Sequence, residues 1–581
     1  MTVATSSFDQ RFATAVRLAD DGHLPQAIEI FAALAHERPE LAPLRHALVR
    51  GLLLAGDPDR AHAEANHPIL LDAREAFRAV VADFAAAGAL HQRGELLRAF
   101  LQRHPDDYDA ALALAAAAHL LGRPSDALRW SEHALALRPQ QRMPREIRAA
   151  SLIDRGDVEA GLAGYRELLR HGDAETAARH LVLMHYDPAQ DNEILFAAHR
   201  DFAQRHLHAF GPPPIASACD PEQPLRIGWL SPRIAAGPVA TFLDGLLARF
   251  DRSRHRHLLI SLEPAQDAAG RRLQTLVEEA VDASGLDDAR LLQRLRALQL
   301  DVLVDLAGHS TGNRLAVLAQ RVAPVQVCWL DWFDTTAVPA MDAWFSDAWL
   351  TPADSTQRYS ERVVRLASGR FCYTPLDDAP SPLHDGAGPP VYASFNRLAK
   401  LNDGVIDAWA DILRRVPESR LELRARHLGE PETRAHIAQR FAERGVDAAR
   451  LQLGGELPYQ ELLAAYRRID VALDPFPFSG CTTTCDALWM GCPVVTLPGA
   501  TFVSRQSASL LWRLGRDEWV ARSRDDYVAC AARLAVDPGA LRADRAGLRD
   551  TVRAQLCDAN AQAADFAAAL RGLWQAQCAR L

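Results

Sequence analysis

Five glycines recur at nearly constant intervals in the first third of the chain, and they constrain its fold more than any other feature. Gly22, Gly56, Gly88, Gly122 and Gly156 are separated by 34, 32, 34 and 34 residues. The segments between them are rich in Ala and Leu with helical periodicity. One helix pair of this length cannot bury its apolar face alone, so successive pairs stack into a superhelix. The spacing therefore predicts an arm of repeated helix pairs over residues 1–205, with a glycine at each turn between helices.

The 34-residue helix pair resembles the tetratricopeptide repeat. An Ala-rich helical domain without true repeats is the alternative, and the interval around Asn66–Ala86 is irregular enough to predict one distorted repeat. Stacked pairs present a concave groove that accommodates extended polypeptide. This part of the chain therefore predicts acceptor proteins or peptides as partners, bound along the repeat groove.

Composition limits the partners and the compartment. The 581 residues are 49% hydrophobic, and the formal net charge is -9. An acidic balance argues against bulk binding to nucleic acid or to an anionic membrane. No apolar stretch approaches the length of a membrane helix, and the N-terminus lacks the pattern of a signal peptide. Nine scattered cysteines, an odd number, favour reduced thiols. We expect a cytoplasmic protein that binds neither nucleic acid nor membrane.

The composition changes near Gly211, and residues 206–224 are expected to be a linker. Short apolar runs then alternate with helical stretches, which is typical of parallel α/β units. A Pro-, Gly- and Asp-rich loop at Pro375–Pro390 divides the series into halves spanning residues 225–385 and 386–581. The first half has expected strands at Leu225–Ser231, His257–Leu262, Asp301–Leu306, Val325–Leu330 and Val363–Leu366. The second has expected strands at Val391–Phe395, Arg420–Arg424, Leu451–Leu453, Val471–Asp474 and Pro493–Leu497.

Two consecutive parallel α/β domains suggest two Rossmann-like halves that face each other across a cleft. Ligands in such sheets bind beyond the carboxyl ends of the strands. The chain has no Gly-x-Gly-x-x-Gly after a strand and no Gly-x-x-x-x-Gly-Lys-Ser/Thr, which weighs against NAD, FAD and P-loop nucleotides. A nucleotide sugar held between the halves is one ligand that fits this layout.

The most informative segment is VALDPFPFSGCTTTCDALWMGCPVVTLPGATFVSR, residues 471–505. Thr482 and Thr483 fall where a helix is expected to begin, so free backbone N–H groups and the helix dipole favour a pyrophosphate there. Asp486 follows on the same helix and could accept hydrogen bonds from a ribose diol. An ordinary helix cap with a solvated Asp is the alternative.

The order Gly-x-Thr-Thr-x-x-Asp-Ala-Leu-Trp-x-Gly-x-Pro-Val-Val-Thr in this segment resembles glycosyltransferase family 41, which includes the protein O-linked N-acetylglucosamine transferases and the SPINDLY-type enzymes. The segment from Phe395-Asn396 to Lys400 resembles the family's Phe-Asn-x-x-x-Lys motif, and Asp305-Leu-Ala-Gly-His-Ser-Thr-Gly-Asn-Arg314 resembles a SPINDLY-type loop. A repeat arm ahead of two catalytic halves is also the family's architecture. The resemblance thus implies a GT-B type α/β region after a tetratricopeptide-repeat superhelix.

The resemblance implies transfer of a sugar, foremost N-acetylglucosamine from UDP-GlcNAc, to Ser and Thr hydroxyls of proteins, with inversion and without a metal or other cofactor. Lys400 would neutralise charge on the leaving nucleotide. His309 could contact donor or acceptor or be structural. The remaining residues implied to bind the donor are Asn396, Arg397, Cys481, Thr482, Thr483 and Asp486.

Three departures from the family pattern leave alternatives open. Gly237 stands where relatives commonly carry a His, so a donor phosphate oxygen becomes a candidate base. Cys481 stands where relatives often have His or Gly, and Trp332–Ala337 replaces a Tyr-Pro-Gly-Thr-Thr/Ser-Gly loop. GDP-fucose or UDP-glucose as donor, and a catalytically weak scaffold that binds proteins through its repeats, are the alternatives. The sequence specifies neither the acceptor proteins nor the oligomeric state.

Overall fold

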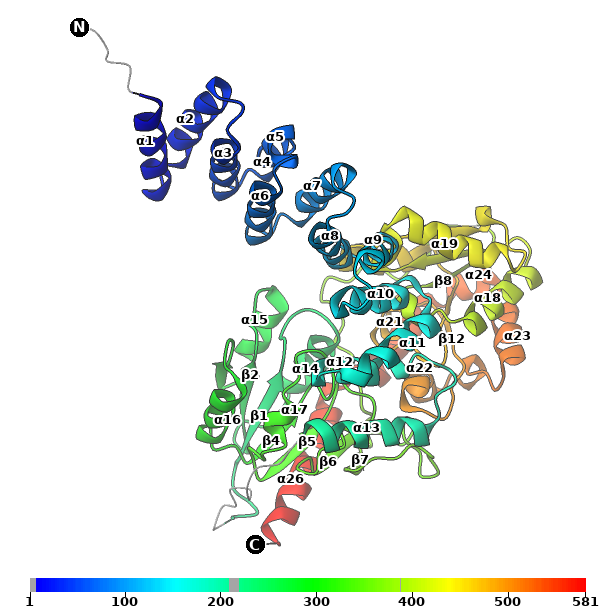
Figure 1. The fold of residues 1–581 in the computed structure, drawn as a ribbon. Helices are drawn as coiled ribbons and strands as arrows, with labels where there is room; N and C mark the ends of the chain where they lie inside the picture. The colour runs from blue at the N-terminus through cyan, green and yellow to red at the C-terminus, as the bar shows by residue number, and fades with distance from the viewer. Residues whose placement is uncertain (1–6, 208–218, 387, 581) are drawn as a thin grey trace. The chain divides into compact units, whose positions relative to one another are not determined.

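The computed structural model describes residues 7–207, 219–386 and 388–580. The chain forms two compact units, Met1–Arg155 and Gly156–Leu581. Paired helices make up the first unit, coloured blue to cyan in Figure 1. Its helices are α1 (Phe8–Asp20), α2 (Leu24–Glu37), α3 (Ala42–Leu54), α4 (Pro58–Ala65), α5 (Pro68–Leu71), α6 (Arg74–Ala86), α7 (Leu90–Arg103), α8 (Tyr108–Leu120), α9 (Pro124–Leu137) and α10 (Arg142–Arg155).

The periodic glycines lie in the turns between helices, as the spacing predicted. All five have positive φ angles, between 70° and 98°. Such angles are costly for residues with a Cβ, so glycine at this position ends one helix and lets the next begin. The expected distorted repeat is also present: α4 has only 8 residues, and the single turn of α5 is inserted before α6. The helical-repeat expectation is confirmed.

The second unit begins with three further helices, α11 (Val158–Leu168), α12 (Ala174–Met184) and α13 (Asn192–His206). The sequence assigned these residues to the repeat arm, whereas the compact units divide after Arg155. Of the expected linker over residues 206–224, residues 208–218 lie outside the described part of the chain.

Two parallel sheets form the α/β region, confirming the expected fold class. The first sheet has seven strands in the order β3-β2-β1-β4-β5-β6-β7, and the second has five in the order β10-β9-β8-β11-β12. The direction in which successive strands are added reverses between β1 and β4 in the first sheet and between β8 and β11 in the second. In parallel sheets this reversal opens a crevice at the carboxyl ends of the strands, where ligands bind.

The first sheet and its helices comprise β1 (Leu225–Ser231), α14 (Pro238–Leu247), β2 (His255–Ser261), α15 (Ala268–Thr275), β3 (Glu279–Asp282), α16 (Asp288–Ala297), β4 (Val302–Asp305), α17 (Leu315–Leu318), β5 (Val325–Cys328), β6 (Ala343–Ser346) and β7 (Arg362–Arg365). The second comprises β8 (Val391–Ser394), α18 (Asp403–Arg415), β9 (Arg420–Arg424), α19 (Pro431–Ala442), β10 (Leu451–Gly454), α20 (Tyr459–Ala465), β11 (Val471–Leu473), α21 (Thr482–Trp489), β12 (Val494–Val495), α22 (Phe502–Arg513), α23 (Arg524–Leu534), α24 (Pro538–Ala543), α25 (Arg545–Leu556) and α26 (Ala559–Cys578). Sequence reasoning did not predict β3 and β6, each four residues long.

The last helix, α26, packs against the first half of the α/β region, although the sequence analysis assigned it to the second half, residues 386–581. Phe566 of α26 packs against Trp329 and Phe345, with ring centroids 4.9 and 4.8 Å apart. The C-terminal segment therefore ties the two halves together.

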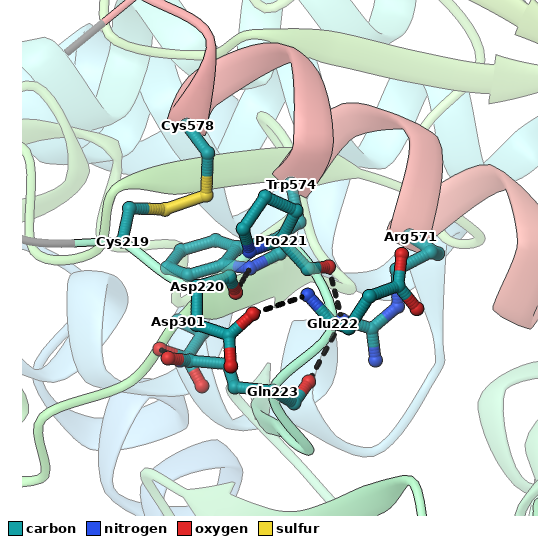
Figure 2. The surroundings of a disulfide bond; sticks show 9 residues. All are labelled: Cys219, Asp220, Pro221, Glu222, Gln223, Asp301, Arg571, Trp574 and Cys578. Atoms are coloured by element: carbon teal, nitrogen blue, oxygen red, sulfur yellow. Dashed lines mark hydrogen bonds between the residues drawn. A yellow bond between two sulfur atoms is a disulfide. The ribbon is translucent and has the colours of Figure 1, made fainter.

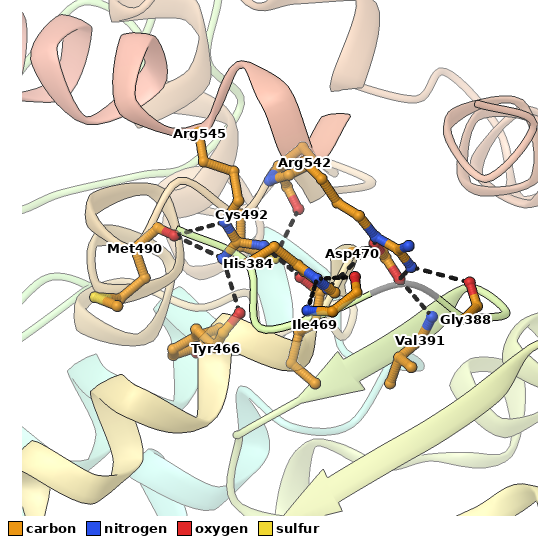
Figure 3. Close-up of polar contacts among 12 residues, drawn as sticks. His384, Gly388, Val391, Tyr466, Ile469, Asp470, Met490, Cys492, Arg542 and Arg545 are labelled. Atoms are coloured by element: carbon orange, nitrogen blue, oxygen red, sulfur yellow. Dashed lines mark hydrogen bonds and ion pairs between the residues drawn. The ribbon is translucent and has the colours of Figure 1, made fainter. Parts of the chain in front are cut away.

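Two buried charges hold the interdomain loop and the C-terminal helices against the second sheet (Figure 3). Asp470 accepts hydrogen bonds from Arg542 at 2.7 and 3.0 Å and from the Val391 N–H at 2.9 Å. Arg545 is 1% exposed and donates to the carbonyl oxygens of Tyr466, Ile469, Met490 and, in the loop, Pro382. These bonds satisfy carbonyls that would otherwise be buried without partners.

A disulfide between Cys219 and Cys578 joins the segment before β1 to the end of α26 (Figure 2). The expectation that all the cysteines are reduced thiols is therefore wrong for this pair. Their 359-residue separation hid the pairing, since only the return of α26 brings them together. Trp574 and Arg571 of the same helix bond the carbonyls of Asp220 and Pro221 at 3.0 and 2.9 Å, which fixes the segment next to the disulfide. Among the helices described, none is long and apolar enough to cross a membrane.

Candidate functional site

A cavity of about 500 Å³ lies where the carboxyl ends of both sheets meet. Segments that follow β4, β5, β8 and β11 contribute to its wall, with residues such as Ser310, Asp331, Asn396 and Ser479. Of these strands, β4, β8 and β11 flank the reversal points and β5 lies next to β4, so the cavity occupies the crevice that the topology provides. Its volume suits a ligand of small-molecule size.

The N-terminus of α21 opens into this cavity. Cys481 is the N-cap residue, and its side chain makes no capping hydrogen bond; Cys481, Thr482 and Thr483 all line the cavity. The first turn contains no acidic side chain. Unpaired N–H groups at a helix start attract anions. This helix end therefore offers N–H donors to an anion, and phosphate binding there stays a prediction.

Lys400 faces the same space from the short 3-10 helix that follows β8. Its Nζ donates to the Ser479 carbonyl at 2.8 Å and to Asn396 Oδ1 at 3.1 Å, and it lies 4.8 Å from the centre of the Phe478 ring. Burial lowers the pKa of Lys400 to about 8, while the nearby Asp474 carboxylate opposes that shift. The ammonium group is thus held by two hydrogen bonds, and the Asp474 carboxylate compensates its positive charge only in part.

The amino-acid count singles out the same residue. The 65 basic side chains of the chain are 64 arginines and one lysine, Lys400. A compact ammonium differs from a planar guanidinium in size and in hydrogen-bond geometry, so the two are not interchangeable in a confined site. Arginine occupies the 64 remaining basic positions and lysine only this one, which indicates that an ammonium group is required here.

Asn396 and Arg397 border the cavity beside this lysine. Asn396 Oδ1 accepts from Lys400 and, at 3.3 Å, from the Thr483 hydroxyl, so it links the lysine to the start of α21. Arg397 is exposed on the cavity wall. The predicted donor-binding residues Asn396, Arg397, Lys400, Cys481, Thr482 and Thr483 are therefore brought together.

Asp486 lies deeper, outside the lining of this cavity. Its Oδ1 accepts hydrogen bonds from the hydroxyls of Tyr373 and Tyr459 at 2.8 and 2.7 Å. Burial raises the pKa of Asp486 to about 6, and the two phenols lower it in part. Ribose binding by Asp486 remains a prediction, and the contacts observed are structural.

His309 and Gly237 also lie outside the lining. His309 is 1% exposed, its Nε2 lies 2.9 Å from the Thr336 carbonyl, and burial lowers its pKa to about 3. Gly237 is the N-cap of α14 with φ 141°, and apart from its chain neighbours no heavy atom of the described residues lies within 4 Å of where its Cβ would be. Space for a side chain exists there, but the backbone conformation is one that only glycine adopts readily.

Asp331 is a candidate functional residue that sequence reasoning missed. It lines the cavity and remains accessible there. Desolvation by the cavity wall raises its pKa to about 6, while Ser310 and Arg397 oppose that shift. A carboxylate with a pKa near neutrality in a cleft is a candidate general base. Its position immediately before Trp332–Ala337, the loop that departs from the family pattern, was the available signal.

Comparison with known proteins identifies the family. The family model of "Glycosyl transferase family 41" matches residues 206–373 and 384–565. The chain belongs to this family. It is 33% identical, over 69% of its length, to the rice (Oryza sativa subsp. japonica) protein "Probable UDP-N-acetylglucosamine--peptide N-acetylglucosaminyltransferase SPINDLY". It is 32% identical, over 68% of its length, to the Arabidopsis thaliana protein of the same name.

The chain spans 44% and 45% of the lengths of these two relatives. Among solved structures, a lysine-to-methionine variant of Thermobaculum terrenum O-GlcNAc transferase is similar to 86% of this chain and 97% of its own, with 34% identity and a TM-score of 0.79. The family 41 architecture of helical repeats and a two-sheet glycosyltransferase region is therefore established for this chain.

Proposed function

We propose that this family 41 glycosyltransferase moves N-acetylglucosamine from UDP-GlcNAc to Ser and Thr hydroxyls of proteins. The observation that carries the proposal is the convergence of Lys400 Nζ, the N-terminus of α21 and the Thr482 and Thr483 hydroxyls on one cavity. These groups suit a pyrophosphate, because each supplies positive charge or hydrogen-bond donors. The names of the similar proteins support the choice of donor.

Lys400 and the helix dipole would stabilise the charge that grows on the departing nucleoside diphosphate. Donors fixed in advance at a developing negative charge contribute strongly in a confined site. Because Lys400 and the helix N-terminus can stabilise this charge without a divalent cation, we propose metal-independent transfer. Direct attack on the anomeric carbon from the face opposite the leaving group then inverts its configuration.

Asp331 is proposed as the general base. Its carboxylate takes the proton from the acceptor hydroxyl while the acceptor oxygen bonds to the anomeric carbon. The bond from that carbon to the phosphate oxygen breaks, and its electron pair leaves with the nucleoside diphosphate. Asp331 supplies a base near neutral pH in a chain that has Gly237 in place of the family's frequent His.

Two alternatives remain open. GDP-fucose or UDP-glucose would use the same pyrophosphate groups. Of the departures from the family pattern, Cys481 lines the cavity and Trp332–Ala337 reaches it through Phe333, whereas Gly237 lies outside the lining. A scaffold with weak activity would bind proteins through the helical repeats alone. Acceptor binding along the repeat groove and a cytoplasmic location also remain predictions.

The test incubates the purified protein with UDP- and GDP-sugars and a host lysate, followed by peptide mass measurement. One sugar mass on Ser or Thr peptides, absent with Lys400→Ala, would support the transferase and name the donor. A second variant, lacking residues 1–155, should still hydrolyse the donor but no longer transfer the sugar to protein, because it lacks the helical repeats proposed to bind the acceptor. No mass shift with any donor, together with tight protein binding by the full chain, would favour the scaffold.

A further inference from the structure

Three metal-ligating side chains meet in the interior of the second unit, away from the lining of the cavity. His185 follows α12, His199 lies within α13, and Asp334 lies in the loop after β5. Their exposed fractions are 2%, 0% and 1%. One potential ligand atom from each lies within 4.8 Å of the others, and His185 Nε2 is 3.6 Å from Asp334 Oδ2.

Hydrogen bonds show which atoms of His199 and Asp334 carry free electron pairs. His199 Nδ1 lies 2.7 Å from the Leu195 carbonyl, which can only accept, so Nδ1 carries the proton and Nε2 a lone pair. Asp334 Oδ1 accepts from the Thr335 N–H at 2.7 Å. Among the described residues, no hydrogen-bond partner exists for His199 Nε2, for Asp334 Oδ2 or for either ring nitrogen of His185.

Aromatic rings make up much of the surrounding wall, and the Gln357 amide lies on the Asp334 side of the cluster. The His185 ring lies 4.7 Å from that of Phe333, and the His199 ring lies 5.7 Å from that of Trp332. Buried polar atoms without partners are rare and call for an ordered water or a bound ion.

We propose that His185, His199 and Asp334 bind one divalent transition-metal ion of the zinc class. Two imidazoles and a carboxylate form a ligand set that zinc favours, and a cation satisfies all three electron pairs while compensating the carboxylate charge. Tetrahedral zinc with bonds of about 2.0–2.1 Å needs ligand atoms about 3.3 Å apart. The observed separations therefore require the side chains to move inward by about 1 Å.

A third imidazole lies beside this triad. The ring of His309 is 5.3 Å from that of His199, and its Nδ1 has no hydrogen-bond partner among the described residues. Its Nε2, 2.9 Å from the Thr336 carbonyl, carries the proton. His309 Nδ1 or a water molecule would complete the coordination.

The ion would have a structural role. It would fasten α12 and α13 to the loop after β5, and this loop supplies Asp331 and Phe333 to the cavity wall. The triad itself is not part of that wall, so the ion would not contact the donor's pyrophosphate. The inference is independent of the sugar, the acceptor and the reaction.

The experiment expresses the full chain in minimal medium supplemented with Co²⁺ or Zn²⁺, because a buried site fills during folding. Metal content is measured by mass spectrometry after removal of loosely bound ions, and the cobalt form is examined by visible absorption and X-ray absorption fine structure. We expect one ion per chain, tetrahedral cobalt bands and scattering from at least two imidazoles. His199→Gln and Asp334→Asn should each lower the metal content at least tenfold.

His257→Gln is the matched control. His257 is also fully buried with an unpartnered Nε2, but it belongs to no metal-binding group among the described residues. Its metal content should equal that of the wild type. If the two triad variants do not fold, the wild-type spectra still show whether imidazoles bind the ion. Wild-type protein without a stoichiometric ion, cobalt coordinated by water alone, or undiminished metal in folded Asp334→Asn would overturn the proposal.

Discussion

Replacing Lys400 with alanine removes the only ammonium side chain of the protein from the candidate donor site. The Nζ atom lies within 3.1 Å of Asn396 Oδ1 and 2.8 Å of the Ser479 carbonyl, so the charge is positioned before any donor binds. Loss of one such preorganised group costs about 3–4 kcal/mol of transition-state stabilisation. At about 1.4 kcal/mol for each factor of ten, kcat should fall about 10²–10³-fold.

The pH dependence follows from the same residue. Burial lowers the pKa of Lys400 to about 8, and the protonated form is the one that attracts the pyrophosphate. The value of kcat/KM should therefore decline as pH rises above about 8, by about tenfold for each unit. Lys400→Arg keeps a charge throughout this range, so the decline should vanish even though the larger guanidinium lowers activity.

Steady-state kinetics with the donor concentration varied at each pH between 6 and 10 give both quantities. Because the chain has one lysine, reductive methylation with ¹³C-formaldehyde labels a single side chain, and an NMR titration measures its pKa directly. Bound nucleoside diphosphate should raise that pKa, since the pyrophosphate favours the charged form. The reasoning fails if Lys400→Ala keeps activity within a few-fold of wild type, or if the pKa lies near 10.5 and ignores the nucleotide.

Four further outcomes are expected. Asp331→Asn should lower kcat at least 10²-fold and remove the decline in activity below about pH 6, which is where the proton-accepting carboxylate is lost; an unchanged acidic limb would rule Asp331 out. Gly237→His should not raise kcat if Asp331 is the base, and it should cost about 1–3 kcal/mol of folding stability because φ is 141°; a gain in kcat would contradict this. Cys578→Ser should lower stability by about 2–5 kcal/mol, and a reductant should lower the melting temperature of the wild type but not of the variant. Arg545→Met should cost about 3–5 kcal/mol in urea unfolding, since four carbonyls lose their buried partner; a cost below about 1 kcal/mol would refute that account.

Short-range patterns in the sequence were sufficient for most of the fold. The spacing of the glycines predicted the helix pairs, since a left-handed turn at each pair is a local requirement. Alternating apolar runs predicted ten of the twelve strands. β3 was missed because its sequence, EAVD, begins and ends with an acidic residue and has no apolar run, and β6 because its AWFS run lies between two aspartates without alternation.

Sequence reasoning likewise predicted only those parts of the candidate site that have local signals. The sequence by itself determined that a helix begins at Thr482 and that Lys400 follows a strand, because helix starts and strand ends leave local signals. Only the tertiary structure decided that Asp486 pairs with Tyr373, 113 residues away, and that Asp331 faces the cavity. Only the tertiary structure, too, joined Cys219 to Cys578. Such contacts depend on how whole sheets and helices pack, and no local pattern of residues encodes which distant side chain will become a neighbour.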